Sequence, residues 1–138
     1  MNLELDVKTG ALFVNRSEFI FYDENYISNN LYLKKHFMVN GFDTYGFEVY
    51  FYGYYFGLNV IFNNGDFVRC FLLTFDGDCC DNFCLKKQLS KLSGLIERKI
   101  NVKPNKGEWK TLFELKWGGI ELNAIRQDYS ITMKIYYI

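Results

Sequence analysis

The stretch that decides the fold is YGFEVYFYGYYFGLNVIFNNGDFVRCFLLTF, residues 45–75. Apolar side chains recur there at every second position, as in Phe47, Val49 and Phe51, and a period of two is typical of a β-strand. The polar segment Asn63-Asn64-Gly65-Asp66 follows, and Asn and Gly accept the positive φ angles of a tight hairpin turn. We therefore expect consecutive antiparallel strands with their apolar rows against one core.

Further strands are expected on both sides of this stretch. Leu3 and Leu5 alternate with acidic residues, and Gly10 suits a turn, so residues 3–14 predict a hairpin. Residues 113–137 alternate in the same way and predict a three-stranded meander, with turns at 118–119 and 126–128. Residues 15–44 show no clear period, and we expect loops and short elements there.

One helix is expected over about residues 83–100. Asp81 or Asn82 can cap its N-terminus, because a short polar side chain there accepts a hydrogen bond from the first turn. The apolar residues that follow recur at helical spacing and form one stripe: Leu85, Leu89, Leu92, Ile96 and Ile100. A helix with one apolar stripe packs that stripe against a sheet or another helix.

These elements predict an α+β fold. We expect a single domain over residues 1–138, since a chain of this length is usually one domain. Its architecture would be a mostly antiparallel twisted sheet of six to eight strands, built from hairpins and a C-terminal meander. The helix at 83–100 would pack on one face of that sheet.

Composition excludes some classes of function but does not identify one. The chain has one His and one Pro, a net charge of zero, and an aromatic content of 20%. No apolar run is long enough for a membrane helix, and no leader pattern opens the chain, so we expect a cytoplasmic protein with no membrane partner. Charge is uneven: residues 1–80 hold five basic and ten acidic side chains, and residues 81–138 hold eleven and six.

The four cysteines are Cys70, Cys79, Cys80 and Cys84. Their spacing lacks the paired ligands of a zinc site, so we expect no metal and no other cofactor. A cytoplasmic location predicts reduced thiols that serve mainly as small core residues. In the alternative interpretation, Cys84 near the helix N-terminus is a reactive thiolate.

Candidate catalytic groups are few. His36 follows two lysines but has no partner at a known catalytic spacing, and the common nucleotide-binding and hydrolase motifs are absent from the sequence. We therefore expect a protein that is not an enzyme. The carboxylates Asp76, Asp78 and Asp81 are too closely spaced for a calcium loop and lack its closing Glu. They predict a solvated turn or an acidic contact patch.

Tyrosines gather between residues 45 and 56. This block contains no Lys or Arg, which disfavours a base-stacking platform for nucleic acid. Tyrosine is enriched at protein interfaces, where the ring buries area and the hydroxyl forms hydrogen bonds. By the period of two, Tyr50, Tyr52 and Tyr54 fall on an outward row with Glu48, so they are either interface anchors or a second layer of core.

Three features together resemble the small bacterial immunity proteins of contact-dependent growth inhibition and polymorphic toxin systems. The first is the hairpin Leu5-Asp-Val-Lys-Thr-Gly10 with Asn15 in the next strand, and the second is a central hairpin followed by one helix. The third is the close of the chain, Trp117-Gly-Gly-Ile-Glu-Leu122 with Tyr129-Ser-Ile-Thr-Met-Lys-Ile-Tyr136. The resemblance covers the two ends and the order of elements, and it transfers no functional residues.

The resemblance implies an antitoxin that binds a cognate toxin domain, such as a nuclease, and covers its active site or a required surface. We expect such a protein to act as a monomer. Two other classes stay open: a small enzyme or ligand-binding domain with an aromatic-lined pocket, and a nucleic-acid binder. The last would use the basic helix face that carries Lys86, Lys87, Lys91 and Arg98.

The predicted partner-binding surface combines tyrosine anchors with acidic side chains that would orient a partner. Its members are Asp43, Glu48, Tyr50, Tyr52, Tyr54, Asp76, Asp78 and Asp81. The rival location is the irregular stretch 23–44, which contains Asp23 and Glu24.

Overall fold

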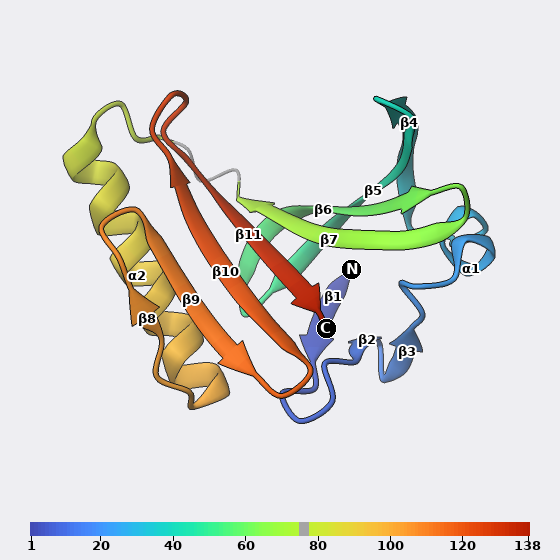
Figure 1. The fold of residues 1–138 in the computed structure, drawn as a ribbon, viewed down its shortest axis with the longest axis horizontal. Helices are drawn as coiled ribbons and strands as arrows, with labels where there is room; N and C mark the ends of the chain where they lie inside the picture. The colour runs from blue at the N-terminus through green and yellow to red at the C-terminus, as the bar shows by residue number, and fades with distance from the viewer. Residues whose placement is uncertain (75–77) are drawn as a thin grey trace.

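A computed structural model of the chain describes residues 1–74 and 78–138. Within them, the fold is α+β, with eleven strands in one sheet and two helices (Figure 1). The sheet order is β3-β2-β1-β5-β6-β7-β11-β10-β9-β8, and β4 pairs with β5 off this path. All described pairs are antiparallel except β1 with β5.

The expected α+β class is confirmed, but the expected count of six to eight strands is too low. The strands are β1 (Asn2–Leu5), β2 (Leu12–Val14), β3 (Ser17–Phe19), β4 (Leu33–Val39), β5 (Phe42–Phe51), β6 (Tyr54–Asn63), β7 (Asp66–Thr74), β8 (Asn105–Lys106), β9 (Lys110–Leu115), β10 (Gly118–Ile125) and β11 (Ser130–Tyr137). The helices are α1 (Glu24–Ser28) and α2 (Asn82–Ile100).

The extra elements come from the N-terminal region. β1 and β2 form the expected hairpin, and a turn at Asn15 and Arg16, both with positive φ, adds β3. The stretch without a clear period also contains α1 and β4. The helix α1 is capped by the side chain of Asp23, and β4 has polar and apolar side chains exposed on both faces, so neither produces a clean alternation.

The central strands depart from the expected pattern at two points. Tyr52 and Gly53 both have positive φ and form the two-residue turn between β5 and β6. The outward row of β5 therefore ends at Tyr50, and the count restarts on β6. A register shift near Ile61 also places Phe67 opposite Phe62, so Phe67 and Arg69 lie on opposite faces although they are two residues apart.

The helix α2 confirms the sequence prediction in both position and cap. Asp81 is the N-cap, and its side chain accepts a hydrogen bond from the backbone N–H of Cys84 at 2.8 Å. The predicted apolar stripe is buried, and Leu92 is 6% exposed. The helix lies behind β9 and β10 in Figure 1 and contacts β9, β10 and β11.

The C-terminal meander forms as expected, but its first turn is displaced. β9 pairs with β10 through Leu115 and Gly118, so the turn consists of Lys116 and Trp117 rather than the two glycines. A Cβ atom at Gly118 or Gly119 would collide with backbone oxygens of neighbouring strands. These glycines therefore permit close strand packing rather than the turn itself.

Trp117 joins the two ends of the chain. Its indole N–H donates to the carbonyl oxygen of Val7 at 2.8 Å, and its ring lies where a Cβ of Gly10 would be. Gly10 has a φ of +80°, so this position requires glycine for its conformation and for its space. The N-terminal hairpin and the segment 117–119 are thus in direct contact.

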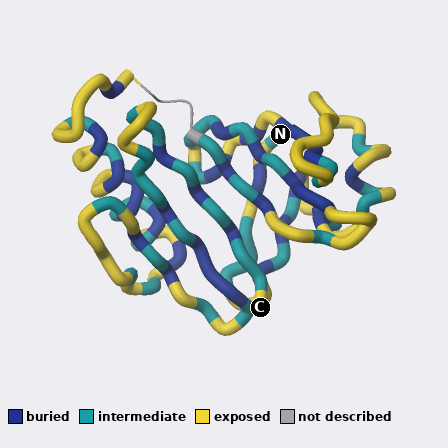
Figure 2. The backbone as a smooth tube through the Cα atoms, turned by 45° about the horizontal axis from the view of Figure 1, so that its top comes forward, coloured by how far each residue is buried: buried dark blue, intermediate teal, exposed yellow. Residues whose placement is uncertain are grey.

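The sheet has two unlike faces. The core face holds the inward rows of the long strands, such as Phe56, Leu58 and Val60 of β6, and α2 covers part of it. We call the other side the open face. Figure 2 shows buried and half-buried backbone along the strands, with exposed residues concentrated in turns and at the ends of elements.

Candidate functional site

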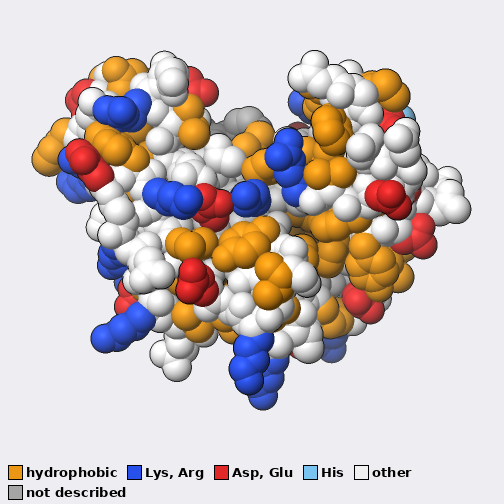
Figure 3. Space-filling view, viewed as in Figure 1, with side chains coloured by type: hydrophobic (Ala, Val, Ile, Leu, Met, Phe, Trp, Pro, Cys, Tyr) orange, Lys and Arg blue, Asp and Glu red, His pale blue; other side chains and the backbone are white. Residues whose placement is uncertain are grey.

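The open face carries a mixture of residue types. It carries Gly46, Glu48 and Tyr50 of β5; Tyr55, Gly57 and Asn59 of β6; Arg69, Phe71 and Leu73 of β7; and Lys110, Glu121, Lys134 and Tyr136 further along the sheet. Aromatic, aliphatic, charged and small residues are therefore mixed within one surface. Figure 3 shows basic and acidic side chains across the middle of the molecule, with hydrophobic side chains beside them.

A hollow of about 270 Å³ lies on this face, over β5 and β6. Its floor includes Gly46 and Gly57, which have no side chains to fill the space. The residues that line it are Lys34, Lys35, Phe37, Gly46, Phe47, Glu48, Tyr55, Gly57, Asn59 and Leu73. Figure 3 shows the molecule notched between the end that carries β4 and the end where α2 begins. We call this site the hollow.

The register explains why these residues meet. Lys35 lies opposite Gly46, Gly46 opposite Asn59, and Asn59 opposite Phe71, so one row crosses four strands. In the next row, Glu48 lies opposite Gly57 and Gly57 opposite Leu73. Because cross-strand neighbours are only about 5 Å apart, a glycine in each row leaves a depression between larger side chains.

Charge on the open face is only partly neutralised. Lys110 and Lys134 both pair with Glu121, and the Arg69 guanidinium lies 4.9 Å from the centre of the Phe71 ring. Burial, followed by a hydrogen bond with Glu48, raises the pKa of Tyr55. Within the described part of the chain, Lys34, Lys35 and Glu48 line the hollow and none of them forms an ion pair, so the charge around the hollow is positive by one.

Of the predicted tyrosine anchors, only one is on the open face. Tyr50 is 50% exposed and packs edge-to-face on Tyr55, its cross-strand neighbour. Tyr52 sits in the turn against Phe51, and burial raises its pKa. Tyr54 lies opposite Phe51 on the core face. The expectation of one shared outward row is therefore wrong, because the turn at Tyr52 reverses the chain.

The predicted acidic residues are dispersed. Glu48 is exposed on the open face, whereas Asp43 belongs to the core-face row of β5. Asp78 is exposed in the loop before α2, and Asp81 is occupied as the helix cap. Asp76 lies outside the described residues. The structure thus places Asp43 and Glu48 on opposite faces of β5. The role of these acidic residues in partner binding stays a prediction.

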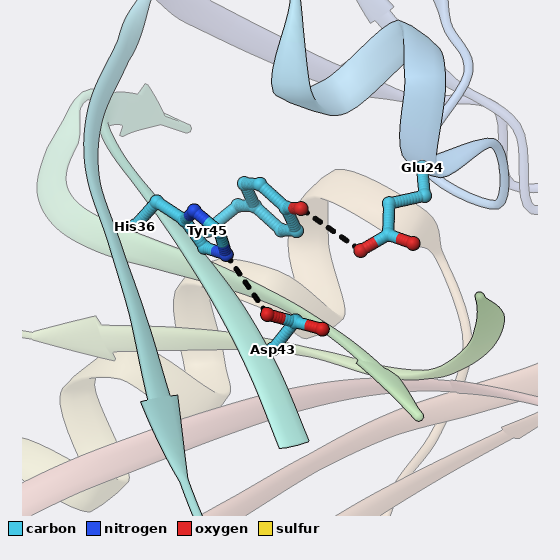
Figure 4. Close-up of polar contacts among 4 residues, drawn as sticks. All are labelled: Glu24, His36, Asp43 and Tyr45. Carbon is cyan, nitrogen blue, oxygen red and sulfur yellow. Dashed lines mark hydrogen bonds and ion pairs between the residues drawn. The ribbon is translucent and has the colours of Figure 1, made fainter. Parts of the chain in front are cut away.

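A second polar cluster lies where β4 and β5 meet α1 (Figure 4). His36 Nε2 is 3.0 Å from Asp43 Oδ1, and the imidazole stacks on the Tyr45 ring with centroids 4.2 Å apart. The Tyr45 hydroxyl donates to Glu24 Oε2 at 2.8 Å. Burial, with the hydrogen bond to Glu24, raises the pKa of Tyr45 to about 12. The Tyr45–Glu24 hydrogen bond links α1 to β5, and the His36–Asp43 pair links β4 to β5.

The expectation of four reduced thiols is wrong. Cys79 and Cys84 form a disulfide, while Cys70 is a buried free thiol and Cys80 an exposed one. The bond forms because Cys84 lies in the first turn of α2 and the preceding loop returns Cys79 to a Cα–Cα distance of 5.4 Å. Cys84 is therefore not a free nucleophile in this structure.

Within the described residues, no cluster of three or more His, Cys, Asp or Glu side chains could hold a metal ion. No helix in the described part of the chain is long and apolar enough to cross a bilayer.

The basic face of α2 is exposed as predicted. Lys87, Lys91 and Arg98 all face solvent, and Lys86 pairs with Glu108 at 3.0 Å and lies 4.9 Å from the centre of the Trp109 ring. This face points away from the sheet, whereas the hollow combines apolar walls with charged rims. The hollow is therefore the stronger candidate site.

Sequence reasoning missed most of the residues in the hollow. Gly46, Gly57 and Asn59 are unremarkable in the linear sequence, and Lys35 belongs to the stretch without a clear period. The signal that could have found them is the pair of glycines on one face of consecutive strands. Using it requires the β5–β6 register, which depends on the turn at Tyr52.

Comparisons with known proteins add no relative. No protein family, curated protein or solved structure matches this chain.

Proposed function

We propose that this chain is a protein-binding module of the immunity type, which neutralises a toxin domain by covering it with the open face. The observation that carries this proposal is the hollow, with its apolar walls, glycine floor and unpaired lysines. Interfaces are typically anchored by a few side chains inserted into such pockets, and charged groups at the rim orient the partner.

The size of the hollow favours a protein partner over a small ligand. Small-molecule sites usually enclose about 300–1,000 Å³ and bury most of the ligand. At about 270 Å³ the hollow is smaller and better suits one inserted side chain. A ligand-binding domain is the second candidate, supported by the mixture of aromatic walls and a few polar groups.

The positive charge beside the hollow changes the expected partner. The sequence predicted acidic side chains on the partner-binding surface, but the charged groups without an ion pair around the hollow are Lys34, Lys35 and Glu48, which sum to one positive charge. We therefore propose a toxin domain whose contact surface is acidic or presents a carboxylate. The proposal includes a monomeric, cytoplasmic protein.

The test is neutralisation of the toxin domain encoded by the reading frame next to this chain. Co-expression of the native chain should restore growth of cells that make the toxin domain. The Lys35→Glu and Tyr55→Ala variants should weaken binding at least tenfold, because the first reverses charge beside the hollow and the second removes a wall.

Lys87→Glu is the matched control, since it makes the same charge change on the outward face of α2. It should change the dissociation constant less than twofold. Circular dichroism would check that each variant is folded. If the folded Lys35→Glu and Tyr55→Ala proteins bind and protect like the native chain, the open face is not the binding surface. If the native chain gives no protection, the immunity function is wrong.

A further inference from the structure

Among the described residues, the strand β4 has a long edge that pairs with no other strand. β4 has seven residues and pairs with β5 on one side, whereas the two ends of the main strand order are β3 with three residues and β8 with two. Natural sheets commonly shorten or cover their edges, because unpaired backbone groups attract other strands. In β4, every residue from Lys34 to Val39 is exposed.

The turn after β4 determines which backbone groups are unpaired. Asn40 and Gly41 form a two-residue turn with φ angles of +52° and +81°, and Val39 lies opposite Phe42. The residues that flank such a turn are a hydrogen-bonded pair, and hydrogen-bonded pairs then alternate along an antiparallel ladder. The N–H and C=O groups of Phe37 therefore point to β5, whereas those of His36 and Met38 point outward.

Apolar side chains surround this free edge. Phe37 is 42% exposed, Met38 66% and Val39 48%. Leu31, in the segment that leads into β4, is 87% exposed. Exposed apolar side chains along a free sheet edge favour a surface that a partner covers.

The charges on β4 favour a different protein over a second copy of this chain as the partner of the free edge. Lys34 and Lys35 form no ion pair within the described residues, and β4 contains no acidic residue. Two β4 strands side by side would bring four lysines together, and edge lysines are a known device against self-association. An acidic segment would instead neutralise both lysines.

We propose that β4 accepts an extended acidic segment of a partner protein as an added antiparallel strand. Its carboxylates lie opposite Lys34 and Lys35, and its apolar side chains lie opposite Phe37 and Met38. This inference rests on the proposed protein-binding function. Because Lys35 and Phe37 also line the hollow, such a strand passes directly beside it.

Hydrogen exchange of the chain alone tests the geometry first. The amides of Lys35 and Phe37 should exchange at least tenfold more slowly than those of His36 and Met38, since only the former bond to β5. An inverted pattern would overturn the assignment of the free edge.

The binding test uses synthetic eight-residue peptides. The acidic peptide has glutamates at the positions opposite Lys34 and Lys35, valines opposite Phe37 and Met38, and threonines elsewhere. It should slow exchange at His36 and Met38. A peptide with lysines in place of the glutamates should bind at least tenfold more weakly, and one N-methylated along its bonding edge should not bind.

Met38→Pro removes one outward N–H without touching the β5 ladder, and it should weaken peptide binding at least tenfold. Met38→Thr keeps that N–H and should change binding less than threefold. Equal binding by all peptides, or by both variants, overturns the proposal. A dimer in analytical ultracentrifugation that Met38→Pro abolishes would assign the edge to a second copy instead. If the peptides fail while Tyr55→Ala still abolishes toxin neutralisation, the added strand is wrong and the proposed function stands.

Discussion

The two faces of β6 illustrate how differently one strand can be constrained. Phe56, Leu58 and Val60 on the core face are completely buried, whereas Tyr55, Gly57 and Asn59 on the open face are half-buried around the hollow. The first set follows from the need to remove apolar surface from water. The second set is only partly removed from water, so burial constrains it less, and the proposed binding function would supply a further constraint.

The largest expected effect is the difference in lost stability between a substitution on the core face and one on the open face. Phe56→Ala removes a buried ring on the core face and should destabilise the fold by about 3–5 kcal/mol. Tyr55→Ala, one residue away on the open face, should cost about 1 kcal/mol or less. Urea denaturation of both variants measures the difference. Equal losses would mean that the open face is part of the structural core.

The core face was largely predictable from the sequence. Alternation identified the rows of β5, β6 and β11, and helical spacing identified α2 with its cap. These patterns work because burial repeats with the period of the backbone. The burial of Leu92 follows the same rule.

The open face was not predictable, for reasons that particular residues show. Tyrosine rarely adopts a positive φ, so a turn at Tyr52 gives no sequence signal, and the expected row of three tyrosines was wrong. The same turn sets the β5–β6 register that brings Gly46 beside Asn59. The disulfide was missed because it depends on the Cα–Cα distance between Cys79 and Cys84, which spacing alone does not give.

The next expected effect is a loss of stability at high pH that is caused by Tyr45, a core-face residue whose ring stacks on His36. Burial and Glu24 raise the pKa of Tyr45 from 10.0 to about 12. The folded state therefore holds the phenolic proton more tightly than the unfolded state does. The stability that this gives is present below pH 10 and is lost as pH rises to 12, by at most about 2.7 kcal/mol at about 1.36 kcal/mol per pH unit.

The check is urea denaturation between pH 9 and about 12 for the native chain and Tyr45→Phe. The difference in unfolding free energy between them should shrink by about 1–2 kcal/mol over this range, because only the native chain loses the Tyr45 contribution. Other tyrosines titrate in both proteins and cancel in the difference. A constant difference would mean that Tyr45 ionises as it does in the unfolded chain.

A smaller effect is expected at Tyr137 on the core face, where a substitution should raise the stability of the fold rather than lower it. Its ring stacks on Phe21 with centroids 4.6 Å apart, but its buried hydroxyl has no hydrogen-bond partner within the described residues. An unsatisfied buried polar group costs about 1–3 kcal/mol, so Tyr137→Phe should stabilise the fold by about 1 kcal/mol. Tyr136→Phe, on the open face, should change stability by less than about 0.5 kcal/mol. Thermal denaturation of both variants compares them, and a loss of stability in Tyr137→Phe would indicate a partner for the hydroxyl.

The smallest expected effect is the contribution of Glu121, on the open face, to stability and its dependence on pH. Glu121 is 13% exposed there and lies between Lys110 at 2.6 Å and Lys134 at 3.2 Å. The hydrogen bond from Lys110 is the main cause that lowers its pKa below the ordinary 4.5. The folded state thus favours the carboxylate, and the resulting stability is present above pH 4.5 and is lost as pH falls through the lowered value.

Both lysines are partly exposed, so solvent screens the network, and we expect Glu121→Gln to cost about 1 kcal/mol or less at pH 7. Between pH 5 and about 3 the native chain should lose this advantage over the variant, whereas Glu114→Gln, at an exposed position on β9, should follow the native curve. Added salt should reduce the effect at pH 7, because screening weakens exposed pairs more than buried ones. A loss well above 1 kcal/mol would show that this part of the open face is held together by its own polar network. The distinction between a core face held by burial and a less constrained open face would then apply only to the strands around the hollow.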